Sequence, residues 1–364
     1  MSRGWKIALS VTAILIVAAA GAWLARGRIA LAIMERAYDR VMDPDPYRDL
    51  PDGLHVGLCG SGSPMADPGR AGPCTVVLAG RELFVVDAGA GGTRNLSLMN
   101  LPPANVDAIF LTHLHSDHID DLGELMLQRW ASGARTAPVP VYGPIGVERV
   151  VAGFMDAYRI DRGFRIAHHG ERVAPPSGFG GAPLAFNAPP QGPDLVLVDT
   201  PDLKVTAFPV PHAPVEPAVG YKFVYKGRSV VISGDTAASA RVEAASKGVD
   251  VLVHEALSPD LVAMQNRAAR THGRANLAAI THDILSYHTP PEAAAAIAQR
   301  AGVRYLLFTH IIPPVPMRAL EGPFLGKSRT IFSGPLRVGQ DGDLISLPAG
   351  STAITRSNRF LVIR

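Results

Sequence analysis

One short segment constrains this chain more than any other feature, because it gathers metal-binding side chains at the end of a predicted strand. Residues 112–118 read T-H-L-H-S-D-H and directly follow the apolar run A-I-F-L. Three imidazoles and one carboxylate within the six positions from His113 to His118 are difficult to explain as packing, since buried histidines need polar partners. His and Asp donors suit zinc, manganese or iron. The segment therefore predicts a metal site.

The spacing within this segment predicts how its donors divide between ions. His113 and His115 lie two positions apart, so in extended backbone they point to the same side and can bind one ion. Asp117 and His118 are adjacent at the turn into a predicted helix, where they can face a second ion. The local pattern thus favours a pair of metal ions at one site.

The segment resembles the H-x-H-x-D-H signature of the metallo-β-lactamase superfamily. Downstream, P-V-P-H-A-P, V-I-S-G-D-T and L-L-F-T-H each place a His or an Asp at the end of an apolar run, as the family pattern requires. The resemblance, which covers roughly residue 54 to the C-terminus, implies two divalent ions, with zinc expected and manganese or iron as alternatives. It implies these ligands: His113, His115 and His212 for the first ion, Asp117, His118 and His310 for the second, and Asp235 as the bridge.

Further segments resemble the ribonuclease Z and arylsulfatase-like branch of that superfamily. They are G-L-C-G-S-G-S-P from Gly57, D-A-G-A-G from Asp87, V-H-E-A-L at 253–257 and Y-H-T-P-P-E-A-A at 287–294. The last two depart from the family's H-E-A-T and H-S-T motifs, because Leu257 replaces Thr, and Thr289 and Pro290 stand where Ser and Thr are usual. The resemblance implies that His288 assists the leaving group beside Glu255. The residues expected to be catalytic are Asp117, His254, Glu255 and His288.

The order of predicted elements indicates a mixed α/β fold. Short apolar runs bounded by Gly, Pro or Asp predict strands at 54–59, 74–78, 82–87, 108–111, 139–142, 205–210, 221–225, 229–232, 249–253 and 305–308. Helical patterns at 119–130, 145–158, 237–245 and 291–301 alternate with these strands. The resemblance implies the four-layer αββα metallo-β-lactamase sandwich. A Gly- and Pro-rich segment at about 161–199 is expected to be a cap over the site or a plain surface insertion, and its His168 and His169 are candidates to touch substrate.

The N-terminus carries an uncharged apolar stretch of 18 residues, from Ile7 to Leu24. This length suits a membrane-spanning helix, although a cleaved secretory signal and a buried core helix are alternatives. Flanking basic residues mildly favour a catalytic part outside the cytoplasm, anchored to the membrane or secreted if the leader is cleaved. The predicted division is an anchor or signal at 1–40, a linker at 41–52 and a hydrolase domain at 53–364.

Charge and cysteine content limit the partners of this chain. Lys and Arg number 35 against 32 Asp and Glu, and no basic run is present, which argues against a nucleic-acid-coating surface. We therefore expect a small anionic ester as substrate, with tRNA as a partner only for a cytoplasmic enzyme. A homodimer is plausible by family resemblance. The two cysteines, Cys59 and Cys74, are too few for a thiolate metal cage, and they either pair or remain separate.

Together these features predict a binuclear hydrolase that cleaves a phosphodiester or sulfate ester by attack of a metal-bound hydroxide. His288, oriented by Glu255, is expected to donate a proton to the leaving oxygen. Asp87 and Asp120 are candidates to support the ligand histidines. The alternatives are a tRNA 3′-processing endoribonuclease, a lactonase or β-lactamase-type hydrolase, and a noncatalytic binding module, which would be expected to have lost ligands.

Overall fold

The computed structural model describes residues 3–360, and the chain divides into two compact units at Asp49 and Leu50. The first unit is dominated by one helix, α1 (Arg3–Val41). Its apolar stretch is long enough to cross a membrane, and none of that stretch is buried within the described part of the chain. The alternative of a buried core helix is therefore not supported, whereas a membrane span and a signal sequence both remain compatible with this helix.

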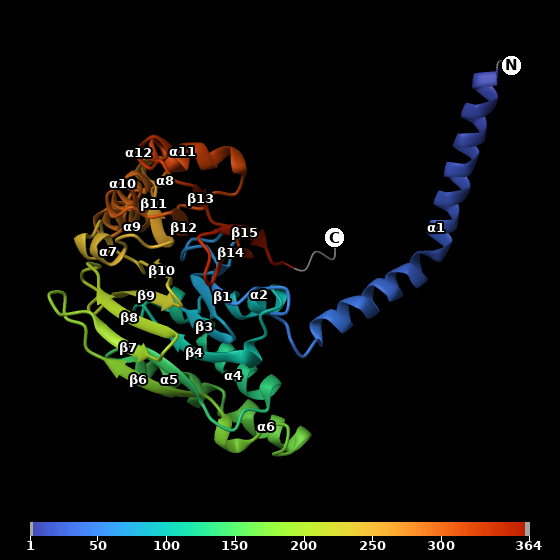
Figure 1. Ribbon diagram of the computed structural model, residues 1–364. Coiled ribbons are helices and arrows are strands. Elements are labelled where there is room, and N and C mark those ends of the chain that lie inside the picture. Colours follow the sequence, from blue (N-terminus) through green and yellow to red (C-terminus); the bar gives the residue numbers. More distant parts are fainter. Residues whose placement is uncertain (1–2, 361–364) are drawn as a thin grey trace. The chain divides into compact units, whose positions relative to one another are not determined.

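The second unit is built on two β-sheets (Figure 1). The first sheet has, in spatial order, strands β15 (Thr355–Asn358), β14 (Asp343–Pro348), β1 (Gly53–Gly60), β2 (Cys74–Ala79), β3 (Glu82–Val86), β4 (Val106–Phe110), β5 (Val139–Pro144) and β6 (Gly181–Phe186). The second sheet has β13 (Leu336–Val338), β12 (Tyr305–Ile312), β11 (Val251–Leu257), β10 (Arg228–Ile232), β9 (Val219–Tyr225), β8 (Leu203–Pro209) and β7 (Leu195–Asp199).

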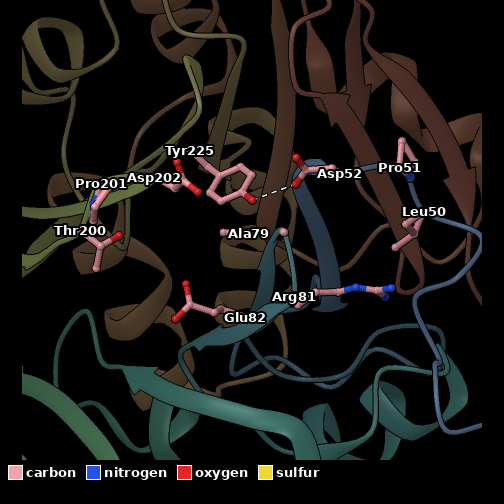
Figure 2. Close-up of a pocket in the computed structure, with 11 residues that line it drawn as sticks. Leu50, Pro51, Asp52, Ala79, Arg81, Glu82, Thr200, Pro201, Asp202 and Tyr225 are labelled. Atoms are coloured by element: carbon pink, nitrogen blue, oxygen red, sulfur yellow. Dashed lines mark hydrogen bonds between the residues drawn. The ribbon is translucent and has the colours of Figure 1, made fainter.

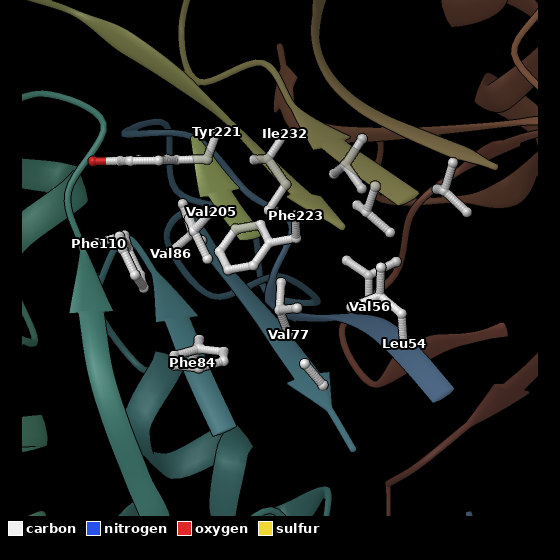
Figure 3. Packing of buried hydrophobic residues seen from close by; sticks show 14 of the residues in the cluster. Leu54, Val56, Val77, Phe84, Val86, Phe110, Val205, Tyr221, Phe223 and Ile232 are labelled. Carbon is white, nitrogen blue, oxygen red and sulfur yellow. The ribbon is translucent and has the colours of Figure 1, made fainter. Parts of the chain in front are cut away.

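The main hydrophobic core lies between these two sheets (Figure 3). It joins side chains of the first sheet, such as Phe84 and Phe110, to side chains of the second, such as Phe223. The rings of Phe84 and Phe110 are 5.9 Å apart in an edge-to-face arrangement, a geometry that aromatic pairs prefer. Strands β1, β2 and β11 are buried along their whole length, as expected for strands covered on both faces.

Helices contact the sheets on the sides away from this core. The first sheet is contacted by α2 (Gly92–Leu98) and α5 (Val147–Ala157), with α4 (Leu122–Gly133) beside α5. The second sheet is covered by α7 (Ala240–Ala245) and α10 (Pro291–Ala301), whose apolar side chains share a core with β11 and β12. The predicted order of four layers, αββα, is therefore present. The remaining helices are α3 (Ser116–Ile119), α6 (Arg159–His169), α8 (Pro259–Thr271), α9 (Ala275–Asp283), α11 (Glu321–Leu325) and α12 (Ser328–Ile331).

The segment at 161–199, expected to be a cap or a plain surface insertion, contains regular structure. It holds most of α6, and then β6 and β7, which are the edge strands of the two sheets. These strands carry exposed positions along much of their length, so their apolar pattern is weak. Strand pairing across the sheet, rather than a strong local pattern, accounts for their regular structure.

The parallel strands fix where chemistry can occur. Strand β4 lies parallel to β3 and β5, and β10, β11 and β12 lie parallel to one another. Because parallel strands end at the same edge of a sheet, the segments that follow β4 and β10 and the last residues of β12 are brought to one end of the sandwich. The two cysteines also meet near the beginning of β2, where Cys59 and Cys74 form a disulfide.

Candidate metal centre

The histidine-rich segment begins two residues after β4, and Asp87 holds its start in place. The backbone N–H and the hydroxyl of Thr112 both donate to the Asp87 carboxylate, each at 2.8 Å. The next residue, His113, is fully buried, and α3 begins at Ser116, so the chain turns sharply between the two pairs of donors. This turn places His113 and His115 on one side and Asp117 and His118 on the other.

The carboxylate of Asp235 lies between the imidazoles. Its Oδ2 atom is 3.2 Å from Nε2 of His310 and 3.3 Å from Nε2 of His118. The same oxygen is 4.0 Å from Nε2 of His113 and 4.0 Å from Nε2 of His212. One carboxylate oxygen therefore faces two histidines of each predicted ligand set, which is the position expected of a bridge between two ions.

All seven predicted metal ligands come together in the structure. Donor atoms within 4.8 Å of one another form three overlapping groups: His113, His115, His212 and Asp235; Asp117, His118 and His310; and Asp235, His288 and His310. Within the first group, Nε2 of His113 is 2.9 Å from Nδ1 of His115. Within the second, Nε2 of His310 is 3.4 Å from Oδ2 of Asp117.

The orientation of the imidazoles fits a divalent metal. Nδ1 of His118 donates to Asp87 Oδ2 at 2.9 Å, and Nδ1 of His212 donates to the Tyr287 carbonyl at 3.1 Å. Nε2 of His118 and of His212 is buried and has no hydrogen-bond partner within the described residues. A buried nitrogen without a partner is costly, and a metal ion would satisfy both. The contact between Asp87 and His118 meets the expectation that Asp87 supports a ligand histidine.

Asp120, the other expected support, is not part of this network of hydrogen bonds among the described residues. It is exposed, and in the part of the chain that the structure describes it makes no hydrogen bond to a ligand histidine. Burial and the nearby carboxylates of Asp117 and Asp121 raise its pKa. Position in the sequence alone did not reveal which of the two aspartates points inward.

The charges in the centre favour an ionised bridge and neutral imidazoles at His113 and His212, whereas the carboxylates of Asp235 and Asp87 outweigh burial and raise the pKa of His118 well above its usual value. Burial opposes ionisation of Asp235, but His310 and His118 outweigh it and hold the pKa of Asp235 well below its usual range. Burial, with the nearby imidazole of His118, lowers the pKa of His113 well below its usual value, and burial also lowers the pKa of His212. Neutral imidazoles keep the lone pairs that a metal ion requires.

The ligand His310 has an unusual backbone conformation. Its φ of 46° lies in the left-handed region, which few residues other than glycine adopt. In the pairing of β12 with β11, Thr309 lies opposite Glu255 and Ile311 opposite Ala256, so His310 is the extra residue of a bulge. Bulges bend a strand and redirect a side chain, and this one brings His310 to Asp235.

A second polar group adjoins the centre. Glu255, which is buried, accepts hydrogen bonds through Oε1 from Nδ1 of His288 at 3.2 Å and from the backbone N–H of Thr289 at 2.9 Å. Burial lowers the pKa of His288, but the Glu255 carboxylate outweighs it, so the pKa is raised. The ring of His288 lies 5.5 Å from that of His310. The predicted pair of His288 and Glu255 is thus beside the metal ligands.

The remaining histidines lie outside the ligand groups. His254 is buried in β11, where its Nδ1 donates to the carbonyl of Glu255 at 2.7 Å and burial lowers its pKa. Its predicted catalytic role stays a prediction. His168 and His169 are exposed at the end of α6. His55 is buried and contacts the Pro51 carbonyl through Nε2 at 3.0 Å.

Cavity size does not identify this site. A hollow of about 490 Å³ reaches Asp117 and is also lined by Asp120 and by residues 63–68. A larger hollow, of about 670 Å³, lies between the β2–β3 turn and the β7–β8 turn (Figure 2). In it, the Tyr225 hydroxyl donates to Asp52 at 2.8 Å, and none of its lining residues belongs to the ligand groups. The donor atoms therefore locate the candidate centre, and the smaller hollow gives access to it.

Comparisons with known proteins point to one family. Residues 83–311 match the family described as "Beta-lactamase superfamily domain". The chain is 36% identical over 302 residues to ribonuclease Z of Mycobacterium avium (strain 104), which covers 82% of this chain and 100% of that protein. It is 36% identical over 292 residues to ribonuclease Z of Mycobacterium bovis (strain BCG / Pasteur 1173P2), covering 79% and 96%.

Solved structures resemble the fold at low sequence identity. The metallo-β-lactamase fold protein YhfI from Bacillus subtilis aligns with a TM-score of 0.56 at 18% identity, covering 80% of this chain and 99% of that one. The short form of human tRNase Z aligns with a TM-score of 0.55 at 23% identity, covering 81% and 99%. These likenesses bear on the fold alone.

Proposed function

The chain belongs to the metallo-β-lactamase superfamily and, within it, to the ribonuclease Z family, and from this membership we propose that it is a metal-dependent phosphodiesterase. The observation that carries the proposal is the position of Asp235, whose Oδ2 lies 3.2 to 4.0 Å from four imidazole nitrogens. The relatives favour RNA as substrate over the small sulfate or phosphate ester expected from the sequence, and nothing in the comparisons supports a sulfate ester.

The proposed ligands divide as the sequence suggested. His113, His115 and His212 would hold one divalent ion, Asp117, His118 and His310 the other, and Asp235 would bridge them. Zinc suits these donors, and manganese or iron suits them too. Bound ions would supply Lewis-acid charge to a phosphoryl group.

The proton needed by the leaving oxygen is assigned to His288. Because Nδ1 of His288 donates to Glu255, its Nε2 is the nitrogen left to face a substrate. Glu255 is itself held by the backbone N–H groups of Thr289 and Thr236, at 2.9 and 3.3 Å. Glu255 is therefore a positioning residue, and a Glu255→Gln substitution would weaken the hold on the imidazole.

Cleavage of precursor tRNA is the first test. The purified full-length chain in detergent, loaded with zinc, is expected to remove the 3′ extension of a precursor tRNA. A chelator is expected to stop the reaction. Asp235→Ala should remove both metal and activity. Asp202→Ala, in the larger hollow that contains no ligand, is the matched control and should remain active. An Asp235→Ala protein with full metal content would refute the ligand assignment.

A small phosphodiester outside the cytoplasm is the second candidate. Two observations favour it: the exposed apolar helix α1, and the Cys59–Cys74 disulfide, a bond typical of oxidising compartments. In this version residues 1–40 anchor the chain in the membrane, residues 41–52 form a linker, and residues 53–364 act on the outer side. A panel of chromogenic phosphodiester, phosphomonoester, sulfate and lactone substrates separates the candidates. Turnover of the diester without cleavage of precursor tRNA would favour the second.

A further inference from the structure

The disulfide lies directly behind the candidate metal centre. Cys59, near the end of β1, and Cys74, the first residue of β2, are both buried. Cys74 lines a small cavity of about 20 Å³ whose other walls include four residues of the centre and its support: Asp87, His118, Asp235 and His310. The half-cystine and the ligands are thus separated by little more than a single small cavity.

The backbone next to Cys74 packs tightly against the segment that follows Asp87. The N–H of Gly89 donates to the Pro73 carbonyl at 2.9 Å. A Cβ added at Gly89 would lie 2.6 Å from the Pro73 nitrogen and 2.4 Å from the Asp117 carbonyl oxygen. The start of β2, the segment after Asp87 and the ligand Asp117 are therefore in direct contact, with no space between them for a side chain at Gly89.

Helix α2 joins the disulfide to the helices after the histidine segment. A Cβ added at Gly92 would lie 2.9 Å from Cys74 Sγ, and the side-chain amide of Asn95 donates to the Cys59 carbonyl at 2.7 Å. The N–H of Thr93 donates to the Asp121 carboxylate at 2.7 Å, just before α4. Both half-cystines therefore contact α2, and α2 is hydrogen-bonded to the segment that follows His118.

We propose that the Cys59–Cys74 disulfide positions the second metal site, and that its reduction weakens binding of the ion held by Asp117, His118 and His310. The inference rests on the ligand assignment proposed above. Reduction by a dithiol transfers two electrons and two protons to the disulfide, which yields two thiols while the dithiol closes to its own disulfide. The start of β2 then loses its covalent link to β1 and is held there by strand pairing alone, and the support of Asp87 on His118 is loosened.

This arrangement makes the metal content of the protein depend on the redox state of its surroundings. In the part of the chain that the structure describes, none of the first-site histidines, His113, His115 and His212, lines the cavity beside Cys74, and the first site is linked to it only through Asp235 and the bonds from Thr112 to Asp87. We therefore expect the two sites to respond differently. The enzyme would hold both ions where the disulfide persists and lose one where it is reduced, which favours the candidate function outside the cytoplasm.

The experiment compares metal content in the full-length protein in detergent. Wild type, loaded with zinc and freed of excess metal, is expected to retain two ions per chain, and Cys59→Ala/Cys74→Ala about one. Leu347→Ala, which is buried in the core between the sheets, is the matched control: it should lower the Tm comparably and keep both ions. Cobalt substitution gives a second readout, because the visible absorption should fall by about half only in the cysteine variant.

A reversible version covers the case in which the cysteine variant does not fold. Wild type is reduced with dithiothreitol, desalted and analysed, and then reoxidised with oxidised glutathione and reloaded with zinc. Loss of one ion on reduction and its recovery on reoxidation are expected. Retention of both ions by the reduced protein or by the folded cysteine variant overturns the proposal. A wild type that binds no metal would instead refute the ligand assignment, so the two failures are distinguishable.

Discussion

At the scale of single residues, the imidazoles of the centre are oriented before any metal arrives. Nδ1 of His113 contacts the Thr112 hydroxyl at 3.1 Å, while the corresponding atoms of His118 and His212 donate to a carboxylate and a carbonyl. Because Nδ1 of each ring is held by one of these partners, Nε2 is the nitrogen left to face an ion. This fixed orientation reduces the rearrangement that metal binding requires.

Asp87 should matter for metal affinity although it is not a ligand. Replacing it by Asn keeps the shape but places an N–H₂ group against donors from Thr112 or His118. We expect zinc affinity to fall by roughly 10- to 100-fold, measured by competition with a chromophoric chelator. Asp120→Asn is the control and should bind like wild type. Equal affinities of the two variants would contradict this role.

The sequence predicted the candidate metal ligands better than the residues that hydrogen-bond to those ligands. His113 to His118, Asp235 and His310 all follow or end apolar strands, so the parallel sheet itself carries them to one edge. Asp87 and Asp120 were equally plausible supports, and only the left-handed turn at Asp87, with φ of 60°, directs its carboxylate inward. A backbone torsion of this kind leaves no clear signal in the residue type.

At the scale of elements, the start of three parallel strands is tied to the C-terminal segment through one carboxylate. Asp250 accepts a bidentate pair of hydrogen bonds from Arg228, both at 3.0 Å, and a further hydrogen bond from Arg304 at 2.6 Å. Arg228 also donates to the carbonyls of Pro348, Ser351 and Ala353. The cluster therefore fastens β10, β11 and β12 to the chain that follows β14.

This cluster should contribute to acid sensitivity. Burial opposes ionisation of Asp250, but the bonds from Arg228 and Ser229 outweigh it and lower the pKa of Asp250. Its contribution to stability is then complete above the ordinary Asp pKa of about 4 and is lost as pH falls through the lower pKa of the folded state. Urea unfolding below about pH 4 should show a smaller pH dependence for Asp250→Asn than for wild type. If the free energy of unfolding of the two proteins changed with pH to the same extent, Asp250 would not contribute to acid sensitivity.

The packing of α10 depends on small side chains. Ala298 is fully buried against the second sheet, in a cluster with β11 and β12. Ala298→Leu should destabilise the fold by about 1–3 kcal/mol through overpacking, measured by urea unfolding. Ala296→Leu, on the less buried side of the same helix, is the control and should change stability little. A neutral Ala298→Leu would show that the helix can shift outward.

The strands near the C-terminus and two strands at sheet edges were the ones the sequence did not reveal. Strands β13, β14 and β15 went unpredicted, and β14 pairs with β1 across nearly the whole second unit. Likewise β6 and β7 were taken for part of an irregular segment. Four of these strands, β6, β7, β13 and β15, are edge strands, which are short or exposed, so their local pattern is weak. The central strands, with the exception of the buried β14, were recognisable as apolar runs.

At the scale of the whole molecule, the chain consists of a helical unit and a catalytic unit with separate internal contacts. The catalytic unit contains every proposed ligand and its own hydrophobic core. The formal charge of +3 is small for a chain of 364 residues. Recognition of an RNA would therefore depend on the site rather than on a broadly basic surface.

Removing residues 1–49 tests this division. The shortened protein is expected to be soluble without detergent, to keep its metal, and to hydrolyse a small phosphodiester with kcat close to that of the full chain, because the removed unit contains no ligand. The full chain should instead sediment with membranes in cell fractionation. A shortened protein that loses its metal would show that the helical unit supports the centre.

The bulge at His310 limits which substitutions such a chain can accept in evolution. A regular ladder between β11 and β12 would need one residue fewer, and it would then point a different side chain toward Asp235. Glycine at this position would relieve the left-handed backbone yet provide no imidazole. Selection for a more perfect sheet and selection for turnover therefore act in opposite directions on the same amino acid.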